Sequence, residues 1–154
     1  MKAIAYNDYA NEALTALGKG AFLTVAHGGK HNTMTIGWGS LGIAWGKPIM
    51  MVMVRPSRFT HHLLEASGEF TVSIPRKDLS QALGLCGTKS GRDVQKPEAA
   101  GLDLKHIPEI ATPVIAGCGL HFACKVVYKQ AMDLDGLVPA YRSRWYGTGD
   151  AHTV

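Results

Sequence analysis

The residue types best suited to chemistry in this chain are gathered in the segment 55–60, Arg-Pro-Ser-Arg-Phe-Thr. Arg55 and Arg58 can each offer a planar pair of N–H donors to a phosphate dianion, and Ser57 and Thr60 can add neutral donors. A helix that begins here would expose unpaired backbone N–H groups and the positive end of its dipole at the same place. The segment therefore predicts a phosphate-binding turn. The alternative is that Ser57 or Thr60 only caps the helix while both arginines are solvated.

The elements on either side of this turn follow from the hydrophobic pattern and the glycine positions. The apolar run Pro48–Val54 predicts a strand buried on both faces, and residues 60–67 predict a helix that Gly68 ends. Residues 69–74 predict another strand, which Pro75 terminates. The turn is thus expected where a strand gives way to a helix.

Strands predominate in the rest of the chain. A β-hairpin is predicted over Ala21–Ala26 and Asn32–Trp38 around Gly28-Gly29, and helices are predicted over 8–17 and 78–86. A functional or locally structured loop is expected over 87–113, and β-type residues return from Val114 to Tyr128. Because the strands are not regularly separated by long helices, we expect a mainly β fold, an antiparallel barrel or sandwich with peripheral short helices. The length suits a single domain, residues 1–154.

Three further patterns suggest other chemistry, and each lacks the expected context. Residues 37–42 match GxGxxG, but no helix follows, so the glycines are interpreted as a bend rather than a dinucleotide site. Cys118, His121 and Cys124 would point to two faces of one strand with no fourth ligand, so no metal site is predicted. Cys86 has no identifiable partner base, and no catalytic nucleophile is predicted.

The composition argues against several classes of partner. The net charge is +4, and the basic residues are spread along the chain, which argues against nucleic-acid binding. The apolar runs are too short to cross a bilayer, and no N-terminal signal pattern is present. The 3 cysteines are an odd number and are expected to be free thiols. We therefore expect a soluble, cytoplasmic protein without membrane association.

Three blocks of sequence, taken together, resemble the flavin reductase-like, FMN-binding split-barrel family, and within it the flavoredoxin-type branch. The blocks are Asn32–Trp38 (NTMTIGW), Lys47–Val72 with its RPSRFT and EFTV motifs, and Cys86–Asp93 (CGTKSGRD). Their order and spacing fit the family from Leu14 to Val127. The resemblance implies a mainly β, Greek-key-like antiparallel split barrel with peripheral short helices, which works as a homodimer.

The resemblance also implies a set of FMN-binding residues. The strand with Asn32, Thr33, Met34 and Thr35 is expected to lie along the isoalloxazine ring. The turn is expected to hold the phosphate through Arg55, Ser57, Arg58 and Thr60. The loop that follows Cys86 is expected to complete the pocket with Ser90 and Arg92. Trp38 could stack on the cofactor or fill the core, and we favour the core.

The activity implied is that of an FMN-binding oxidoreductase or electron-transfer protein of flavin reductase or flavoredoxin type. Such a protein takes hydride from NAD(P)H to FMN and passes electrons to an acceptor. No catalytic acid or base is predicted, because hydride transfer to flavin does not require one. Two alternatives stay open: an FMN-binding electron carrier or sensor served by a redox protein, and a flavin-free barrel that binds another phosphorylated ligand such as pyridoxal phosphate.

The segment Gly147–Val154 resembles the family's late GD-x-H strand, after which members usually continue into at least one more strand. The sequence is therefore expected to be cut short at its carboxyl end, or to close its barrel differently. A role for Asp150 or His152 in the site is left open. An unpaired strand edge there would need cover from a partner subunit.

Overall fold

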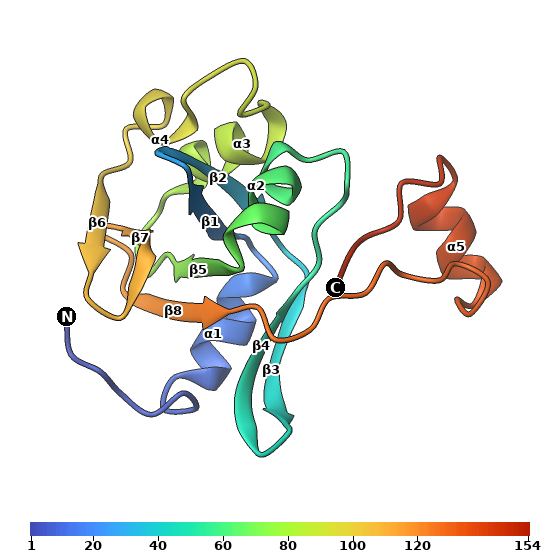
Figure 1. Ribbon diagram of the computed structural model, residues 1–154, viewed down its shortest axis with the longest axis horizontal. Helices are drawn as coiled ribbons and strands as arrows, with labels where there is room; N and C mark the ends of the chain where they lie inside the picture. Colours follow the sequence, from blue (N-terminus) through green and yellow to red (C-terminus); the bar gives the residue numbers. More distant parts are fainter.

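The computed structural model describes residues 1–154 and shows short helices arranged around antiparallel β-sheets (Figure 1). The helices are α1 (Ala10–Leu17), α2 (Phe59–Ser67), α3 (Ser80–Thr88), α4 (Lys96–Ala99) and α5 (Pro139–Tyr146). The strands are β1 (Ala21–His27), β2 (Lys30–Ile36), β3 (Gly39–Ala44), β4 (Lys47–Val52), β5 (Glu69–Ile74), β6 (Leu104–Ile107), β7 (Ile110–Ile115) and β8 (Leu120–Lys125). The expected mainly β, antiparallel fold with short helices is confirmed.

The largest sheet has the strand order β2-β1-β5-β8, with every pair antiparallel. Its central strand β1 is almost entirely buried, and Leu23 pairs with Met34 of β2 on one side and with Val72 of β5 on the other. These three side chains belong to the main hydrophobic core. Because β2 and β8 are edge strands of this sheet, each keeps one row of backbone groups that no strand of the sheet uses.

The β1–β2 hairpin forms as predicted. Its turn contains Gly28 and Gly29, whose φ angles of 57° and 75° lie in the left-handed region that only glycine adopts readily. The turn fixes the register that brings Asn32 opposite Val25 and Thr33 opposite Thr24. The strand expected to lie along a ligand is therefore anchored to the centre of the fold.

The β3–β4 hairpin corrects two predictions. Residues 37–42 were expected to form a bend, but β3 begins at Gly39 and pairs with β4. The expected close approach at these glycines does exist, since a Cβ on Gly39 would lie 2.6 Å from the Met51 carbonyl oxygen. β4 is not buried on both faces, because the hairpin extends beyond the main sheet and leaves much of the strand only half-buried (Figure 1).

The segment 87–113, expected to be a functional or locally structured loop, contains α4, β6 and most of β7. The β-structure predicted from Val114 to Tyr128 is present as the end of β7 and the whole of β8. β7 ends at Ile115, and Gly117, with a φ of 82°, turns the chain before β8. α5 was not predicted. It lies apart from the sheets at the end of an extended segment, as Figure 1 shows.

The helices that matter for the site pack on the sheet around β2. α2 packs across β1 and β2, and α3 packs on β2 through a second cluster that includes Phe22, Ala82 and Cys86. α2 ends as predicted at Gly68, whose φ is 68°. None of the five helices is both long and apolar enough to span a bilayer.

Candidate functional site

The turn before α2 is held by tertiary hydrogen bonds and not by helix capping. No side chain caps the N-terminus of α2. Ser57 Oγ donates to Asp150 Oδ2 at 2.6 Å, and the buried Thr60 Oγ1 accepts a bond of 2.7 Å from Asn32 Nδ2. The alternative in which Ser57 or Thr60 caps the helix is therefore wrong. The unpaired N–H groups at the start of the helix stay available to a ligand.

A polar cavity of about 100 Å³ lies beside this turn. Its walls come from β2, the start of α2, the end of α3 with the loop after it, and α4. The residues are Met34, Ser57, Arg58, Phe59, Thr60, Cys86, Gly87, Thr88, Lys89, Ser90, Gly91 and Lys96. Three of them are cationic and none is acidic, so the lining favours an anion.

Lys96 is the buried charged residue among those lining this cavity that sequence reasoning missed. Its side chain is only 5% exposed, and Nζ donates to the Cys86 carbonyl oxygen at 2.8 Å. Burial lowers the pKa of Lys96; the Cys86 thiol opposes this shift and Arg58 adds to it. No carboxylate pairs with the ammonium group. Such a buried cation gains stability when an anion enters the cavity.

The loop after α3 is packed tightly against the turn and β2. A Cβ on Gly91 would lie 2.2 Å from Asn32 Oδ1 and 2.6 Å from Phe59 Cδ1, so only glycine fits without a shift. Arg92 donates through Nη1 to the Ser57 carbonyl oxygen at 3.2 Å, and its guanidinium lies over the Phe59 ring. Arg92 therefore joins the loop to the turn without lining the cavity.

A second hollow, of about 240 Å³, adjoins the first along β2. It is lined by Met34, Thr35, Ile36, Gly37, Trp38, Met53, Arg55, Arg58, Trp145 and His152. Met34 and Arg58 line both hollows, so a cationic pocket for an anion continues into a more apolar space beside an edge strand. One ligand with a phosphate at one end and a flat apolar ring at the other suits this combination.

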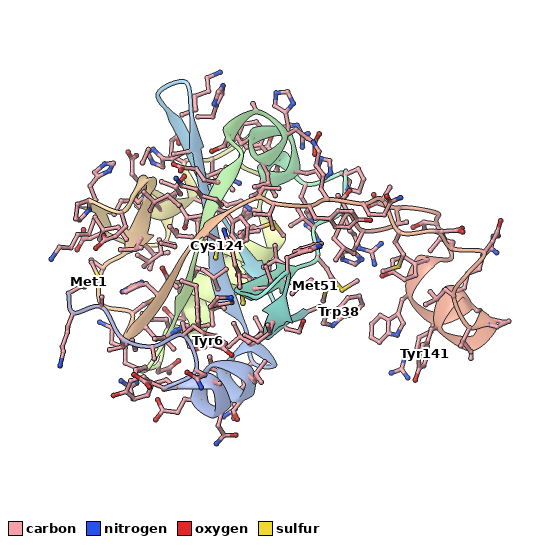
Figure 2. The ribbon with its side chains drawn as sticks, turned by 60° about the horizontal axis from the view of Figure 1, so that its bottom comes forward. Met1, Tyr6, Trp38, Met51, Cys124 and Tyr141 are labelled. Carbon is pink, nitrogen blue, oxygen red and sulfur yellow. The ribbon has the colours of Figure 1, made fainter.

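Aromatic side chains surround the far end of this second hollow. Trp38 and Trp145 meet edge to face with ring centroids 4.9 Å apart, and His152 lies 5.2 Å from Trp38. Trp38 is 37% exposed, and Figure 2 shows it on the side of the fold that faces α5. The assignment of Trp38 to the core is therefore wrong, because the chain after β2 turns outward before β3.

Arg55 lies in the second hollow rather than in the polar cavity. Its guanidinium donates to the Asp150 carbonyl oxygen at 2.6 Å and to the Trp145 carbonyl oxygen at 2.9 Å, and it lies over the Tyr146 ring. Arg55 thus fastens the α5 region to the turn. The guanidinium of Arg58 makes one hydrogen bond, of 3.5 Å, to the Gly87 carbonyl oxygen and is the freer of the two arginines.

His152 is buried at the border between α5 and the hollow. Tyr146 Oη lies 2.8 Å from His152 Nδ1. Burial is the main reason that the pKa of His152 falls to about 4, and the charge of Arg55 adds to it while Asp150 opposes it. The imidazole is therefore neutral at physiological pH.

The structure brings most of the expected binding residues to these hollows. Met34, Ser57, Arg58, Thr60 and Ser90 line the polar cavity, and Met34, Thr35, Arg55 and Arg58 line the second hollow. Asn32, Thr33 and Arg92 line neither. Asn32 lies beneath Thr60, and Thr33 hydrogen-bonds Thr24 within the sheet at 2.9 Å. The assignment of these residues to a ligand remains a prediction.

The three cysteine thiols are not ionised at physiological pH and therefore bring no negative charge to the site. Burial raises the pKa of the Cys86 thiol, and that of Cys118 to about 11 and Cys124 to about 12. No group of three His, Cys, Asp or Glu side chains is placed to hold a metal ion.

Comparison with known protein families identifies the family of the chain that contains these two hollows. The model of the flavin reductase like domain matches residues 17–139, which is most of the chain and includes β2, the turn and the loop after α3. The chain belongs to this family. The split-barrel fold expected from the resemblance is confirmed, because structural neighbours of the flavin reductase-like family share it.

Individual relatives of this flavin reductase-like chain are distant. An uncharacterized protein of Archaeoglobus fulgidus is 31% identical over 106 residues, which are 69% of this chain and 59% of the relative. The chain therefore spans less than two thirds of the length of that relative. Flavoredoxin from Methanosarcina acetivorans superposes with a TM-score of 0.68 at 23% identity, over 87% of this chain and 62% of that protein.

A third similarity extends over more of the chain. An FMN-binding domain of a flavin reductases-like enzyme from Shewanella baltica superposes with a TM-score of 0.66 at 20% identity, over 94% of this chain and 70% of the other. At these identities the two solved structures establish the shared fold of the family and not a shared substrate.

Proposed function

We propose that this flavin reductase-like chain binds FMN across the two connected hollows and is an oxidoreductase or electron-transfer protein that uses this cofactor. The observation that carries the proposal is the continuity of the hollows: the anion-selective cavity and the apolar hollow share Met34 and Arg58. FMN has a phosphate dianion at one end and a flat tricyclic ring at the other, and the family and its FMN-binding structural neighbours support this choice.

The residues divide between the two ends of the cofactor. Arg58 and Lys96 supply positive charge around the phosphate, and the hydroxyl group of Ser90, which accepts from the Arg92 amide, supplies a short neutral donor. Ser57 lines the same cavity but donates its proton to Asp150. Met34, Trp38 and Met53 supply apolar surface for the ring and exclude water from it. The free edge of β2 offers backbone groups to the polar edge of the ring, as the resemblance implies.

The redox chemistry is that of FMN itself, which when bound can exchange a hydride or single electrons. The chain's part is to hold and orient the cofactor. His152 is neutral at physiological pH and adds no charge beside the ring. We propose a reduced nicotinamide as the hydride donor, with electrons passed on to a separate acceptor.

The visible spectrum of the purified protein tests this proposal. We expect oxidised flavin bands that are retained on FMN addition and gel filtration and that bleach on anaerobic addition of NADH or NADPH. Bleaching only with a reduced protein donor would replace the reductase by an electron carrier. A pyridoxal-like spectrum, or no uptake of FMN at all, would contradict the proposed cofactor.

Three companion inferences belong to the same proposal. A single domain over residues 1–154, a homodimer and a cytoplasmic location all remain predictions of the sequence and its resemblance. Gel filtration with light scattering measures the homodimer directly, since a dimer elutes with twice the mass of the 16.5 kDa chain.

A further inference from the structure

The segment that carries α5 leaves the end of β8 and returns to the same place, where its two ends are paired. Met132 donates to the His152 carbonyl oxygen at 2.9 Å, and Gln130 and Val154 exchange hydrogen bonds of 2.9 and 3.0 Å. This paired base fixes where the α5 arm, residues 133–151, begins and ends.

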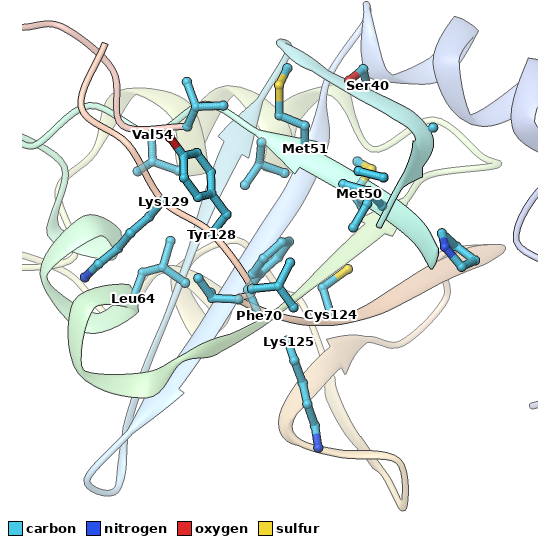
Figure 3. Close-up of a pocket in the computed structure, with 18 of the residues that line it drawn as sticks. Ser40, Met50, Met51, Val54, Leu64, Phe70, Cys124, Lys125, Tyr128 and Lys129 are labelled. Carbon is cyan, nitrogen blue, oxygen red and sulfur yellow. The ribbon is translucent and has the colours of Figure 1, made fainter. Parts of the chain in front are cut away.

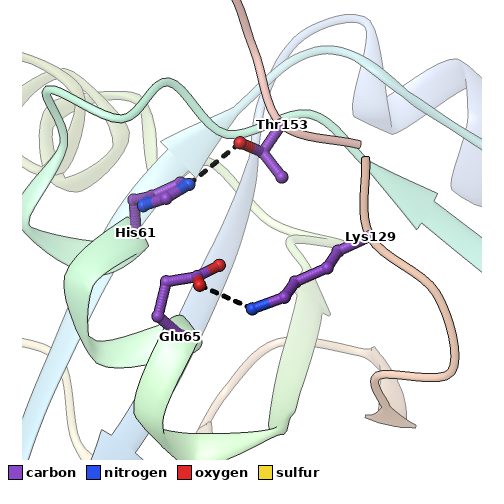
Figure 4. A network of polar contacts seen from close by, with 4 residues as sticks. All are labelled: His61, Glu65, Lys129 and Thr153. Atoms are coloured by element: carbon purple, nitrogen blue, oxygen red, sulfur yellow. Dashed lines mark hydrogen bonds and ion pairs between the residues drawn. The ribbon is translucent and has the colours of Figure 1, made fainter. Parts of the chain in front are cut away.

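α2 holds both strands of this base. His61 hydrogen-bonds Thr153 at 2.9 Å, and Glu65 forms an ion pair with Lys129 (Figure 4). Lys129 also lines, with Leu64 of α2, the largest hollow of the fold, of about 750 Å³ (Figure 3). The base therefore belongs to the folded body, and contacts made beyond it decide how firmly the arm is held.

The α5 arm itself is poorly buried. Tyr146 is the one buried residue between 133 and 149, and α5 lies apart from the sheets (Figure 1). Polar bonds to the turn before α2 hold the arm: Arg55 donates to two of its carbonyl oxygens, and Ser57 Oγ donates to Asp150 Oδ2 at 2.6 Å. Because the arm buries little apolar surface, each of these bonds contributes a large share of the free energy that keeps it closed.

Ser57 connects the arm to the polar cavity. Its side chain lines that cavity together with Arg58 and Lys96. A serine hydroxyl has a single proton to donate, and here that proton is directed to Asp150. Toward the cavity Ser57 therefore presents lone pairs, which repel the oxygen atoms of a phosphate dianion.

A phosphate group in the cavity competes with Asp150 for this donor. The Asp150 carboxylate makes no ion pair and is partly exposed, so water can take the place of Ser57 there. A phosphate enclosed in a cavity of about 100 Å³ has less access to water, and Arg58 and Lys96 attract it. The hydroxyl therefore stabilises the phosphate more than the carboxylate, and the two anions also repel each other.

We propose, on the basis of the phosphate site of the proposed function, that Ser57 couples the polar cavity to the α5 arm. A phosphate group in the cavity turns the Ser57 hydroxyl away from Asp150 and loosens the arm. Because Trp145 of the arm lines the second hollow, this loosening opens the border of that hollow once phosphate is bound. Coupling between two sites is reciprocal, so the bond between Ser57 and Asp150 in turn weakens phosphate binding.

Limited digestion with trypsin tests this coupling, because Arg142 and Arg144 are exposed in α5. We expect saturating FMN, and also millimolar inorganic phosphate, to make cleavage after these arginines about fivefold faster. Riboflavin, which has no phosphate, should leave the rate unchanged. Unchanged or slower cleavage with bound FMN would overturn the coupling and leave the cofactor standing. Faster cleavage with phosphate in a protein that takes up no FMN would contradict the cofactor and support the coupling.

Two variants separate the coupling from a merely structural role of this hydrogen bond. Asp150→Ala and Ser57→Ala both remove the bond, so each should make cleavage without ligand about fivefold faster and abolish the further increase with FMN. Only Asp150→Ala leaves the hydroxyl free for the phosphate. It should therefore lower the dissociation constant of FMN about fivefold, whereas Ser57→Ala should not lower it.

Asp135→Asn is the matched control, because it removes a carboxylate of the same arm that pairs only with the exposed Arg142. This variant should leave the dissociation constant of FMN unchanged. If Asp150→Ala raised that constant or left it at the native value, Asp150 would not compete with the phosphate and the coupling would be wrong.

Discussion

Lys96 shows how a side chain of the candidate site escapes sequence reasoning. A lysine is expected in solvent by default, and nothing in the run Gln95-Lys96-Pro97 distinguishes it. Only the packing of α4 against α3 and β2 buries it and directs it to the polar cavity. Arg58 and Ser57, by contrast, could be predicted, because two arginines and two hydroxyls in one strand-to-helix turn are informative without any tertiary contact.

Lys96→Met should have opposite effects on the ligand-free and the FMN-bound protein. The ligand-free variant should unfold at no lower temperature, because a buried, unpaired charge is replaced by an apolar side chain of similar length. The rise in unfolding temperature on addition of FMN should be smaller than in the native protein, because the phosphate has lost one positively charged partner. Thermal scans with and without FMN measure both. A variant that is destabilised and keeps the full FMN-induced rise would contradict the assignment.

The buried His152 predicts an acid-sensitive stability. Its pKa is about 4 in the folded chain against about 6.5 when unfolded, so between these values the unfolded chain binds a proton that the folded chain does not. Acidification through this window should therefore lower the free energy of unfolding by up to about 3 kcal/mol, less where solvent screens the imidazolium, and the loss should level off below about pH 4. Urea titrations of the native protein and His152→Gln check this. An identical loss in both would rule out His152 as its source.

At the scale of elements, predictions succeeded where a local signal decides the conformation. The paired glycines at 28 and 29 fixed the hairpin, and Gly68 fixed the end of α2. β3 was missed because its glycines weaken the strand pattern and only pairing with β4 makes it a strand. α5 was missed because its residues, Pro139–Tyr146, show no apolar stripe at helical spacing.

Gly91→Ala tests whether the loop after α3 shapes the site through its contact with β2. The added methyl group would overlap Asn32 and Phe59, so we expect a loss of about 2 kcal/mol in the free energy of unfolding, with weakened FMN binding. Gly84→Ala is the matched control in the same region. It meets nothing within 4 Å and lies within α3, so it should raise stability by up to about 1 kcal/mol. Equal effects of both would contradict this packing.

At the scale of the molecule, α5 is held to the rest of the fold near the site itself. Arg55 donates to two carbonyl oxygens of this region, and Ser57 binds Asp150. The same turn thus lines the candidate site and anchors the segment that borders it. This arrangement could not be read from the sequence, where Arg55 looks like a second phosphate ligand, because the partners lie 90 and 95 residues away.

Arg55→Ala should therefore release α5 from the fold. The loss of two charge-assisted hydrogen bonds favours local opening, so limited proteolysis between residues 133 and 149 should be about tenfold faster. Arg142→Ala, which breaks only an exposed ion pair with Asp135, should leave the cleavage rate nearly unchanged. Equal cleavage of both variants would show that Arg55 does not anchor this segment.

The account rests on a phosphate held beside Arg58, and paired dissociation constants for FMN and riboflavin test it most directly. Measured on the native protein, on Arg58→Ala and on Arg76→Ala, whose arginine forms a remote, exposed ion pair, they separate the phosphate from the ring. We predict that Arg58→Ala raises the dissociation constant of FMN by roughly 10- to 100-fold and leaves that of riboflavin nearly unchanged. Arg76→Ala should leave both dissociation constants nearly unchanged. Equal losses for FMN and riboflavin in Arg58→Ala, or none for either, would contradict it.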